Sequence, residues 1–494
     1  MTATLLKCAA SATALAIGFC GSSFAMAEDA AEADVIRDEI TVTGSRVVRD
    51  GEDAPTPTTV IGLEDVQKSA PAYLADYLNQ LPELANSLSP TTGRNGSSSG
   101  GNFLNLRGLG VNRTLVLLDS RRVAPSILTG GVDISLLPTS LVKRVDIVTG
   151  GASAAWGSDA VAGVINIILD KDFTGVKGTA QYGITDEGDG EQYKVNMSLG
   201  TSFANERGHV LVSVEHTDVS SIEKASARDW YQGWNIIPNP DAGVMGQPAR
   251  LVIPGVGVAR SAPEGVISTG PLAGTGFDEN GAPVPYDLGF TAGLLSFGGD
   301  AFLHGGESQI QVPLKTTTVF ARTEYEISPV LTVFAEGNFA QTDNDYLVRS
   351  YQRFGDITIQ NDNAFLHPAM VQAMTDASVT SFNMGKIHLD FGPSNVQNDR
   401  RLFRGVVGAE GDLGAGWEWD SYYQYGKTSI DANVVNNVVT ARYNEAVDSV
   451  LSGGIPVCRS TLSNPGNGCV PVNPFGANAA SSDSRDYVVG VASQ

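Results

Sequence analysis

The sequence is poor in basic residues, histidine and cysteine, and each shortage removes a class of function. Lysine and arginine total 32 against 54 aspartates and glutamates, so the 494-residue chain has a net charge of −22. A chain this acidic is not suited to nucleic acid or to an anionic membrane surface. The five histidines, at positions 209, 216, 304, 367 and 388, lack the neighbouring cysteine or histidine ligands of a zinc site. We therefore expect no nucleic-acid partner, no metal and no cofactor.

The first 27 residues have the pattern of a secretory signal peptide. Residues 1–7 carry one positive charge, residues 8–25 are small and apolar, and Ala25-Met26-Ala27 is a cleavage site of the A-x-A type. The apolar part is too short for a transmembrane helix, which needs about 20 apolar residues. The sequence therefore predicts export across the inner membrane.

Export leaves one pair of cysteines. Cleavage after Ala27 removes Cys8 and Cys20, so the mature chain keeps only Cys458 and Cys469, with ten residues between them. In an oxidising compartment such a pair closes a loop. We therefore predict a disulfide bond between Cys458 and Cys469.

Apolar and polar residues alternate in many segments after Phe173. In the segment 193–199, Tyr193, Val195 and Met197 alternate with polar residues. This is the pattern of a strand with one face on lipid and the other on a wet lumen. Similar alternation recurs in the segments 176–182, 210–216, 319–327, 331–339, 403–409 and 417–425. The sequence thus predicts about seven strands.

The connections between these segments are short and long in turn. Those at 201–208, 328–330 and 411–416 are short, whereas 218–317 and 341–401 span about a hundred and about sixty residues. Short periplasmic turns and long extracellular loops are typical of outer-membrane barrels, while a soluble sandwich more often has loops of about 2 to 5 residues on both sides. Residues 173–494 are therefore predicted to be part of an antiparallel transmembrane β-barrel, with the cysteine pair in an extracellular loop.

Residues 58–172 are predicted to form a compact α+β domain. An apolar helical face begins at Leu74, and a hairpin is expected to turn at Asp119-Ser120. Residues 141–169, LVKRVDIVTGGASAAWGSDAVAGVINIIL, place a glycine-rich turn between two β-runs. Together with LRGLGVNRTLVLLDSRRV at 106–123, this segment resembles the plug domain of TonB-dependent outer-membrane receptors, although Trp156 stands where these receptors usually carry tyrosine.

Residues 28–57 are acidic, polar and proline-bearing, which predicts a flexible arm. The arm contains Glu39-Ile40-Thr41-Val42-Thr43-Gly44, a β-prone stretch that could add as a strand to the edge of a partner's sheet. It resembles the TonB box of the same receptors. The resemblance implies that the periplasmic domain of TonB binds Glu39, Ile40, Thr41, Val42, Thr43 and Gly44.

The resemblance implies a receptor in the outer membrane of a Gram-negative bacterium, embedded in outer-membrane lipid. It would import a scarce extracellular nutrient, a ferric siderophore or another large ligand; siderophore, haem, cobalamin and oligosaccharide all remain open. Receptors of this kind close about 22 strands, so a chain with about seven is expected to be a fragment lacking most of the barrel. The alternative is a signalling or adhesion receptor on the same scaffold. An enzyme is not expected, because no nucleophile and base are paired.

We also predict a charge lock between the plug and the barrel wall. Arg107 lies next to Gly108 on a segment expected to be a plug strand facing the wall. Glu324, Glu326 and Glu336 occupy alternate, lumen-facing positions of the predicted strands and could accept a bidentate pair. Arg144 is the next candidate for the plug side. The other interpretation of Arg107 is an exposed arginine without a partner.

Overall fold

The computed structural model describes residues 58–493 apart from 86, 93–97, 151 and 416. The predicted signal peptide (1–27) and arm (28–57), including Glu39 to Gly44, lie outside the described residues. Among the described helices, none is both long and apolar enough to cross a bilayer.

Residues 58–172 fold around a mixed five-stranded sheet, which confirms the predicted α+β class. In spatial order the strands are β1 (Thr58–Gly62), β4 (Val142–Thr149), β5 (Gly163–Leu169), β2 (Thr114–Leu118) and β3 (Arg121–Arg122), and only β2 and β5 are parallel. The helices are α1 (Leu63–Ser69), α2 (Leu74–Leu78) and α3 (Ser153–Trp156). Every residue of β2 is buried, as expected for a strand covered on both faces. We call residues 58–172 the plug.

Glycines make the connection from β4 to β5 possible. Gly157, which follows α3, has a φ of +86°, and Gly163 has a φ of +141°. A Cβ atom on Gly163 would lie 2.1 Å from the carbonyl oxygen of Val148 on the neighbouring strand. Only glycine fits such a close approach, so the glycine-rich segment allows the tight turn that its sequence predicted.

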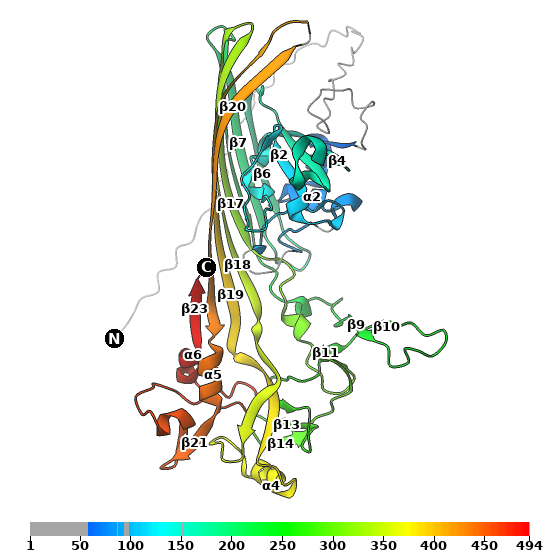
Figure 1. The fold of residues 1–494 in the computed structure, drawn as a ribbon, viewed down its shortest axis with the longest axis vertical. Coiled ribbons are helices and arrows are strands. Elements are labelled where there is room, and N and C mark those ends of the chain that lie inside the picture. Colours follow the sequence, from blue (N-terminus) through cyan, green and yellow to red (C-terminus); the bar gives the residue numbers. More distant parts are fainter. Residues whose placement is uncertain (1–57, 86, 93–97, 151, 416, 494) are drawn as a thin grey trace, which may run out of the picture. The chain divides into compact units, whose positions relative to one another are not determined.

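Seven long antiparallel strands, each paired with its neighbour, make up most of a second sheet, which has 11 strands; we call these seven the wall (Figure 1). They are β6 (Gly175–Gly183), β7 (Gln192–Phe203), β8 (Gly208–Val219), β17 (Leu314–Ser328), β18 (Leu331–Gln360), β19 (Ser381–Asp412) and β20 (Glu418–Val438). A short strand, β23 (Val489–Ser493), pairs with one end of β20. The turns after β7, β17 and β19 are the three that were predicted to be short.

The connection predicted over 341–401 is wrong in extent. Strands β18 and β19 stay paired from Asn344 with Asn398 up to Gln360 with Ser381, so the connection is only 361–380 and contains α4 (Pro368–Asp376). These distal halves were missed because they lack a regular alternation of exposed and buried positions. The period of two marks a strand only where one face stays apolar.

The two faces of the wall differ in chemistry. On the outer face, a row of exposed apolar side chains crosses five strands: Met197, Val214, Val319, Phe339 and Phe403. Further along the same strands lies a row of charged side chains: Asp218, Lys315, Asp343, Asp399 and Asp431. An apolar band with a polar border is the pattern of a lipid-facing surface.

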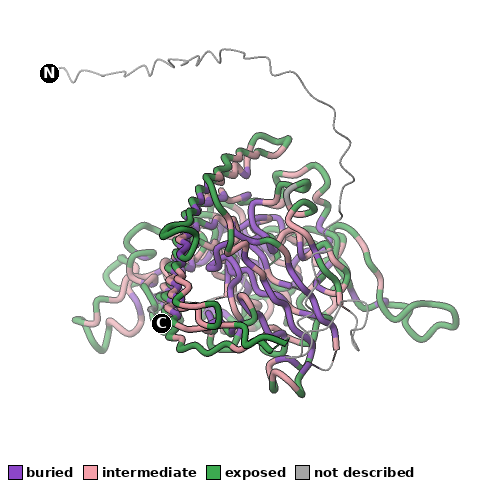
Figure 2. The backbone as a smooth tube through the Cα atoms, turned by 90° about the horizontal axis from the view of Figure 1, so that it is seen from above, coloured by how far each residue is buried: buried purple, intermediate pink, exposed green. Residues whose placement is uncertain are grey.

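The inner face of the wall packs against the plug. Leu211, Phe320, Ala340 and Leu402 from four adjacent strands are buried in the same hydrophobic core as residues of the plug sheet. Figure 2 shows the buried residues concentrated in the middle of the molecule. The plug therefore rests on the concave side of the wall.

The long connections fold together with the distal halves of β18 and β19. We call residues 220–313, 361–380 and 439–488 the loop region; they share a core that includes Phe277, Met370, Tyr443 and Phe475 with residues of β18 and β19. Its further elements are β9 (Asn235–Pro238), β10 (Arg250–Ile253), β11 (Val256–Val258), β12 (Val266–Ile267), β13 (Thr275–Phe277), β14 (Pro283–Pro285), β15 (Phe290–Ala292), β16 (Leu295–Phe297), α5 (Thr440–Val447), β21 (Ser449–Ser452), β22 (Ile455–Cys458) and α6 (Ser482–Val488).

Candidate functional site between the plug and the wall

Glu336 on β18 is the centre of a buried charge cluster between the plug and the wall. Its carboxylate accepts hydrogen bonds from Arg121 Nη1 at 2.8 Å, Arg322 Nη1 at 2.5 Å and Arg404 Nη1 at 3.1 Å. The side chain of Arg121 is 8% exposed, and the other three are 2% exposed or less. Arg121 belongs to β3 of the plug, whereas Arg322 and Arg404 belong to β17 and β19. One wall carboxylate thus joins the plug to three adjacent wall strands.

Two further carboxylates balance the charge of the three arginines. Arg322 Nη2 lies 2.7 Å from Glu324 and 3.5 Å from Glu410, and Arg404 Nε donates to the amide oxygen of Gln424 at 3.0 Å. We call Arg121, Arg322, Arg404, Glu324, Glu336 and Glu410 the Glu336 cluster. Buried charges cost several kcal/mol each unless they are paired. Removal of the plug would therefore leave Glu336 with one cation fewer.

The ion pair predicted for Arg107 is not formed, because Arg121 takes its place. Arg107 is exposed, and within the described residues no hydrogen bond or ion pair extends from its side chain. The segment expected to be a strand is instead a short 3-10 turn, Leu106–Gly108, in which Arg107 has a φ of +54°. The side chain therefore does not follow the alternation that would have aimed it at the wall.

Arg144, the second candidate, forms an ion pair within the plug. Its Nε lies 3.0 Å from Asp146 Oδ1 on the same strand, β4. Glu336 does lie between the plug and the wall, and Glu324 lies beside it on the wall. Arg322, rather than Arg107 or Arg144, is the arginine that contacts both.

Sequence reasoning missed Arg121, although its position carried a signal. Asp119 and Ser120 both have positive φ values, which is the geometry of a two-residue hairpin turn of type I′. The next two residues, Arg121 and Arg122, then point to opposite sides of β3. Arg121 is buried against Glu336, whereas Arg122 pairs with Asp159 of the plug itself at 2.5 Å. Two consecutive arginines after a hairpin turn were the available indication that one faces the wall.

A second polar contact joins the plug to β8. Glu215 accepts hydrogen bonds from the Thr139 hydroxyl at 2.7 Å and from the Ser140 backbone amide at 2.8 Å. Lys194 on β7 lies 3.3 Å from the same carboxylate. The plug is therefore held to the wall at two separate carboxylates, on β8 and on β18.

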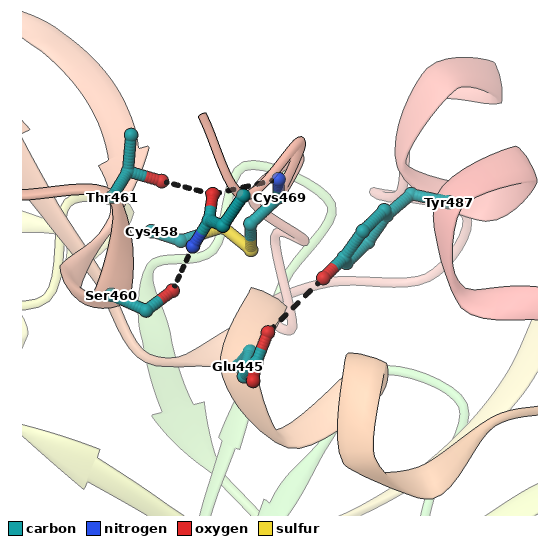
Figure 3. The surroundings of a disulfide bond; sticks show 7 residues. Glu445, Cys458, Ser460, Thr461, Cys469 and Tyr487 are labelled. Carbon is teal, nitrogen blue, oxygen red and sulfur yellow. Dashed lines mark hydrogen bonds between the residues drawn. A yellow bond between two sulfur atoms is a disulfide. The ribbon is translucent and has the colours of Figure 1, made fainter. Parts of the chain in front are cut away.

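The disulfide bond is present in the loop region. Cys458 at the end of β22 is bonded to Cys469, and the residues around them are linked by hydrogen bonds (Figure 3). Asn467 accepts from the backbone amide of Cys469 at 3.0 Å, and its amide nitrogen donates to Ser460 at 2.8 Å. Both a covalent bond and a side-chain network thus close this loop. In the part of the chain that is described, no three His, Cys, Asp or Glu side chains gather as metal ligands would.

Comparison with known proteins identifies the family that the plug resembles. Residues 50–164 match the family of the TonB-dependent Receptor Plug Domain. A mutant of the ferric enterobactin receptor PfeA from Pseudomonas aeruginosa, solved with enterobactin, is similar at 17% identity and a TM-score of 0.42, over 78% of this chain and 42% of that one. The siderophore receptor PiuA from Acinetobacter baumannii is similar at 14% identity and a TM-score of 0.37, over 90% of this chain and 53% of that one. The chain thus spans about half the length of these receptors or less.

Proposed function

Because this chain carries a plug domain of the TonB-dependent receptors, which are outer-membrane proteins of Gram-negative bacteria, we propose that it serves in the energised uptake of a scarce nutrient. The nutrient is a ferric siderophore or another large ligand that binds from outside. The observation that carries this proposal is the seat of the plug on the concave face of the wall, held by the Glu336 cluster.

The lengths of the connections support an orientation in the membrane. The short turns of the wall face the periplasm and the loop region faces the outside, as the lengths of the connections in outer-membrane barrels require. The apolar row that includes Val319 and Phe339 contacts outer-membrane lipid.

The arm enters the plug at a strand that can be detached first. β1 lies at the edge of the plug sheet, and among the described strands it pairs with β4 alone, through the five residues Thr58–Gly62. A pull by TonB on Glu39 to Gly44 reaches β1 before it reaches the buried strands β2 and β5. Rearrangement of the plug then requires Arg121 to leave Glu336, and the inner-membrane proton-motive force supplies the work.

The test is a backbone change in the arm. Proline at position 40 removes a main-chain donor from the strand that would pair with TonB, whereas Ile40→Val keeps both the donor and the β-propensity. We expect Ile40→Pro to abolish binding of the purified periplasmic domain of TonB and energised uptake, with ligand binding at the cell surface intact. Ile40→Val should behave as the parent chain. Normal uptake by Ile40→Pro would refute the proposal.

A further inference from the structure

The loop region contains a pocket of about 630 Å³ to which the proposed function assigns no role. Its lining comes from the connection before β17, from β19 and from the connection after β20. Four large apolar or aromatic side chains line it: Tyr231, Phe302, Leu303 and Leu389. Three carboxylates also line it: Glu264, Asp300 and Glu307. Among the described residues that line it, none is basic and none belongs to the plug. We call this cavity the loop pocket.

A buried lysine holds the floor of the loop pocket in place. Lys386 on β19 is fully buried, and its ammonium donates to the carbonyl oxygens of Pro263 at 2.8 Å and Gly476 at 2.6 Å. Pro263 lines the pocket, and Gly476 precedes Ala477, which also lines it. One ammonium group therefore joins the three chain segments that build the pocket. A site held in this way is formed before its ligand arrives.

The strand that carries Lys386 continues this arrangement. His388 shares a hydrogen bond of 2.8 Å with the hydroxyl of Tyr443 on α5, and Asp390 accepts from the backbone amide of Ala480 at 3.1 Å. Leu389 lies between these two residues, at a register shift of the strand pair, and is exposed where it lines the pocket. The hydrogen bonds of His388 and Asp390 thus hold in place the backbone that carries Leu389.

The aromatic wall is set by a pair of glycines. A Cβ atom on Gly305 would lie 3.0 Å from the Tyr231 hydroxyl, and one on Gly306 would lie 3.2 Å from its ring. The backbone of residues 305 and 306 therefore packs closely on Tyr231. Together with Phe302 and Leu303, the ring provides a surface for an apolar ligand body.

The three carboxylates differ in whether they already have a hydrogen-bond or ion-pair partner. Glu307 pairs with Lys224 at 3.1 Å, and Asp300 accepts from the backbone amide of Asp287 at 2.8 Å. Within the described residues, no hydrogen bond or ion pair reaches the side chain of Glu264. Among the described residues that line the pocket none is basic, and the two nearby cations are already held: Lys224 by Glu307, and the buried Lys386, which lies within electrostatic range of Glu264, by two carbonyl oxygens. The lining therefore disfavours an anionic ligand, whereas a cation can pair with Glu264.

We propose that the loop pocket binds a small organic cation with an apolar or aromatic body, its charge on Glu264 and its body against Tyr231 and Phe302. This inference rests on the proposed function, because it requires the loop region to face the outside of the cell. It adds a recognition site that lies away from the plug and selects by charge.

The test compares three probes with the same phenyl ring and different charges. 2-Phenylethylamine, 2-phenylethanol and phenylacetate are titrated into the purified full chain in detergent, and binding is measured by saturation-transfer NMR and calorimetry. We expect the amine to bind most tightly and phenylacetate most weakly. Glu264→Gln should weaken the amine about two- to five-fold, the range of a partly exposed ion pair, and leave the alcohol unchanged.

Two variants control the experiment. Glu279→Gln removes an exposed carboxylate from the same connection but outside the pocket, so it should change none of the three affinities. Tyr231→Leu should weaken all three probes because it removes the aromatic wall.

Three results would overturn the assignment: no binding of any probe, phenylacetate binding as tightly as the amine, or amine binding that Glu264→Gln does not change. TonB is absent from the assay, so its outcome is separate from that of the Ile40→Pro test. Amine binding by a chain that fails the TonB test would refute the proposed function alone.

Discussion

Replacement of Arg121 by alanine should loosen the plug without unfolding it. The change removes one charged hydrogen bond of 2.8 Å to Glu336, and it also removes a guanidinium that lies 4.6 Å from the centre of the Phe334 ring. A hydrogen bond to a charged group contributes about 1.5 to 3 kcal/mol, and a cation over a ring adds about 0.5 to 1 kcal/mol. Loss of one partner from a buried pair costs about 3 to 5 kcal/mol when the other charge is left alone.

The expected cost for Arg121→Ala lies below that upper range, because Arg322 and Arg404 still neutralise Glu336. We expect about 2 to 3 kcal/mol, which corresponds to roughly a 30- to 150-fold larger population of the open plug. Glu336→Gln should cost more, about 3 to 5 kcal/mol, since three arginines then lose their shared carboxylate.

The assay is hydrogen exchange of the plug segment that contains Ser140, whose backbone amide donates to Glu215 of the wall, in the purified chain, read by mass spectrometry. Arg122→Ala is the matched control, because the neighbouring arginine pairs with Asp159 inside the plug and both side chains are about half exposed, at 47% and 51%. It should cost at most about 1 kcal/mol, and Arg107→Ala should have no effect. Equal exchange in the Arg121→Ala and Arg122→Ala variants would refute the role of the Glu336 cluster, and faster exchange in Arg107→Ala would restore the interpretation from sequence.

Three further outcomes are expected. Replacing both Cys458 and Cys469 by serine should destabilise the loop region by about 3 kcal/mol in the chain-entropy account of a loop this size, seen as a lower Tm that dithiothreitol no longer changes. Burial lowers the pKa of His388 from 6.5 to about 4, although its bond to Asp390 opposes this. The unfolded chain therefore binds the proton first, and the stability of the loop region should be complete above pH 6.5 and fall toward pH 4 by up to about 3 kcal/mol; a pH series of thermal unfolding in which His388→Gln keeps the same slope would contradict this. Phe339→Arg on the lipid face should destabilise the wall by about 2 to 4 kcal/mol in a bilayer, and Phe339→Leu should be nearly neutral in the same unfolding assay.

Much of the wall was predictable because its signal is local. In the segments near the lipid, each residue's exposure is set by its parity along the strand, so Val319 and Phe339 could be placed on the outer face from sequence. The distal halves of β18 and β19 lack that parity, so the sequence predicts a loop where the structure has strands. The Asp119-Ser120 turn was likewise predictable, because two residues between two β-runs define a hairpin.

The candidate site was predictable only on the wall side. Glu324 and Glu336 were placed on the inner face by parity alone, whereas the choice of the plug arginine depended on how the segment around Arg107 folds. Arg107 has a left-handed backbone conformation in a 3-10 turn, so its side chain points away from the wall. A single such residue leaves no repeating pattern in the sequence from which it could be predicted.

The sequence by itself determined the order of the parts: a plug with a glycine-closed turn, a lipid-facing wall, and a pair of cysteines close enough to bond. These features depend on residues that are neighbours along the chain or repeat with a fixed period. The tertiary structure alone decided that Arg121 meets Glu336 across 215 positions and that Lys386 joins Pro263 to Gly476. Such contacts depend on the seating of whole elements against each other, because a buried charge finds its partner only after the packing of the plug and the loops has excluded water.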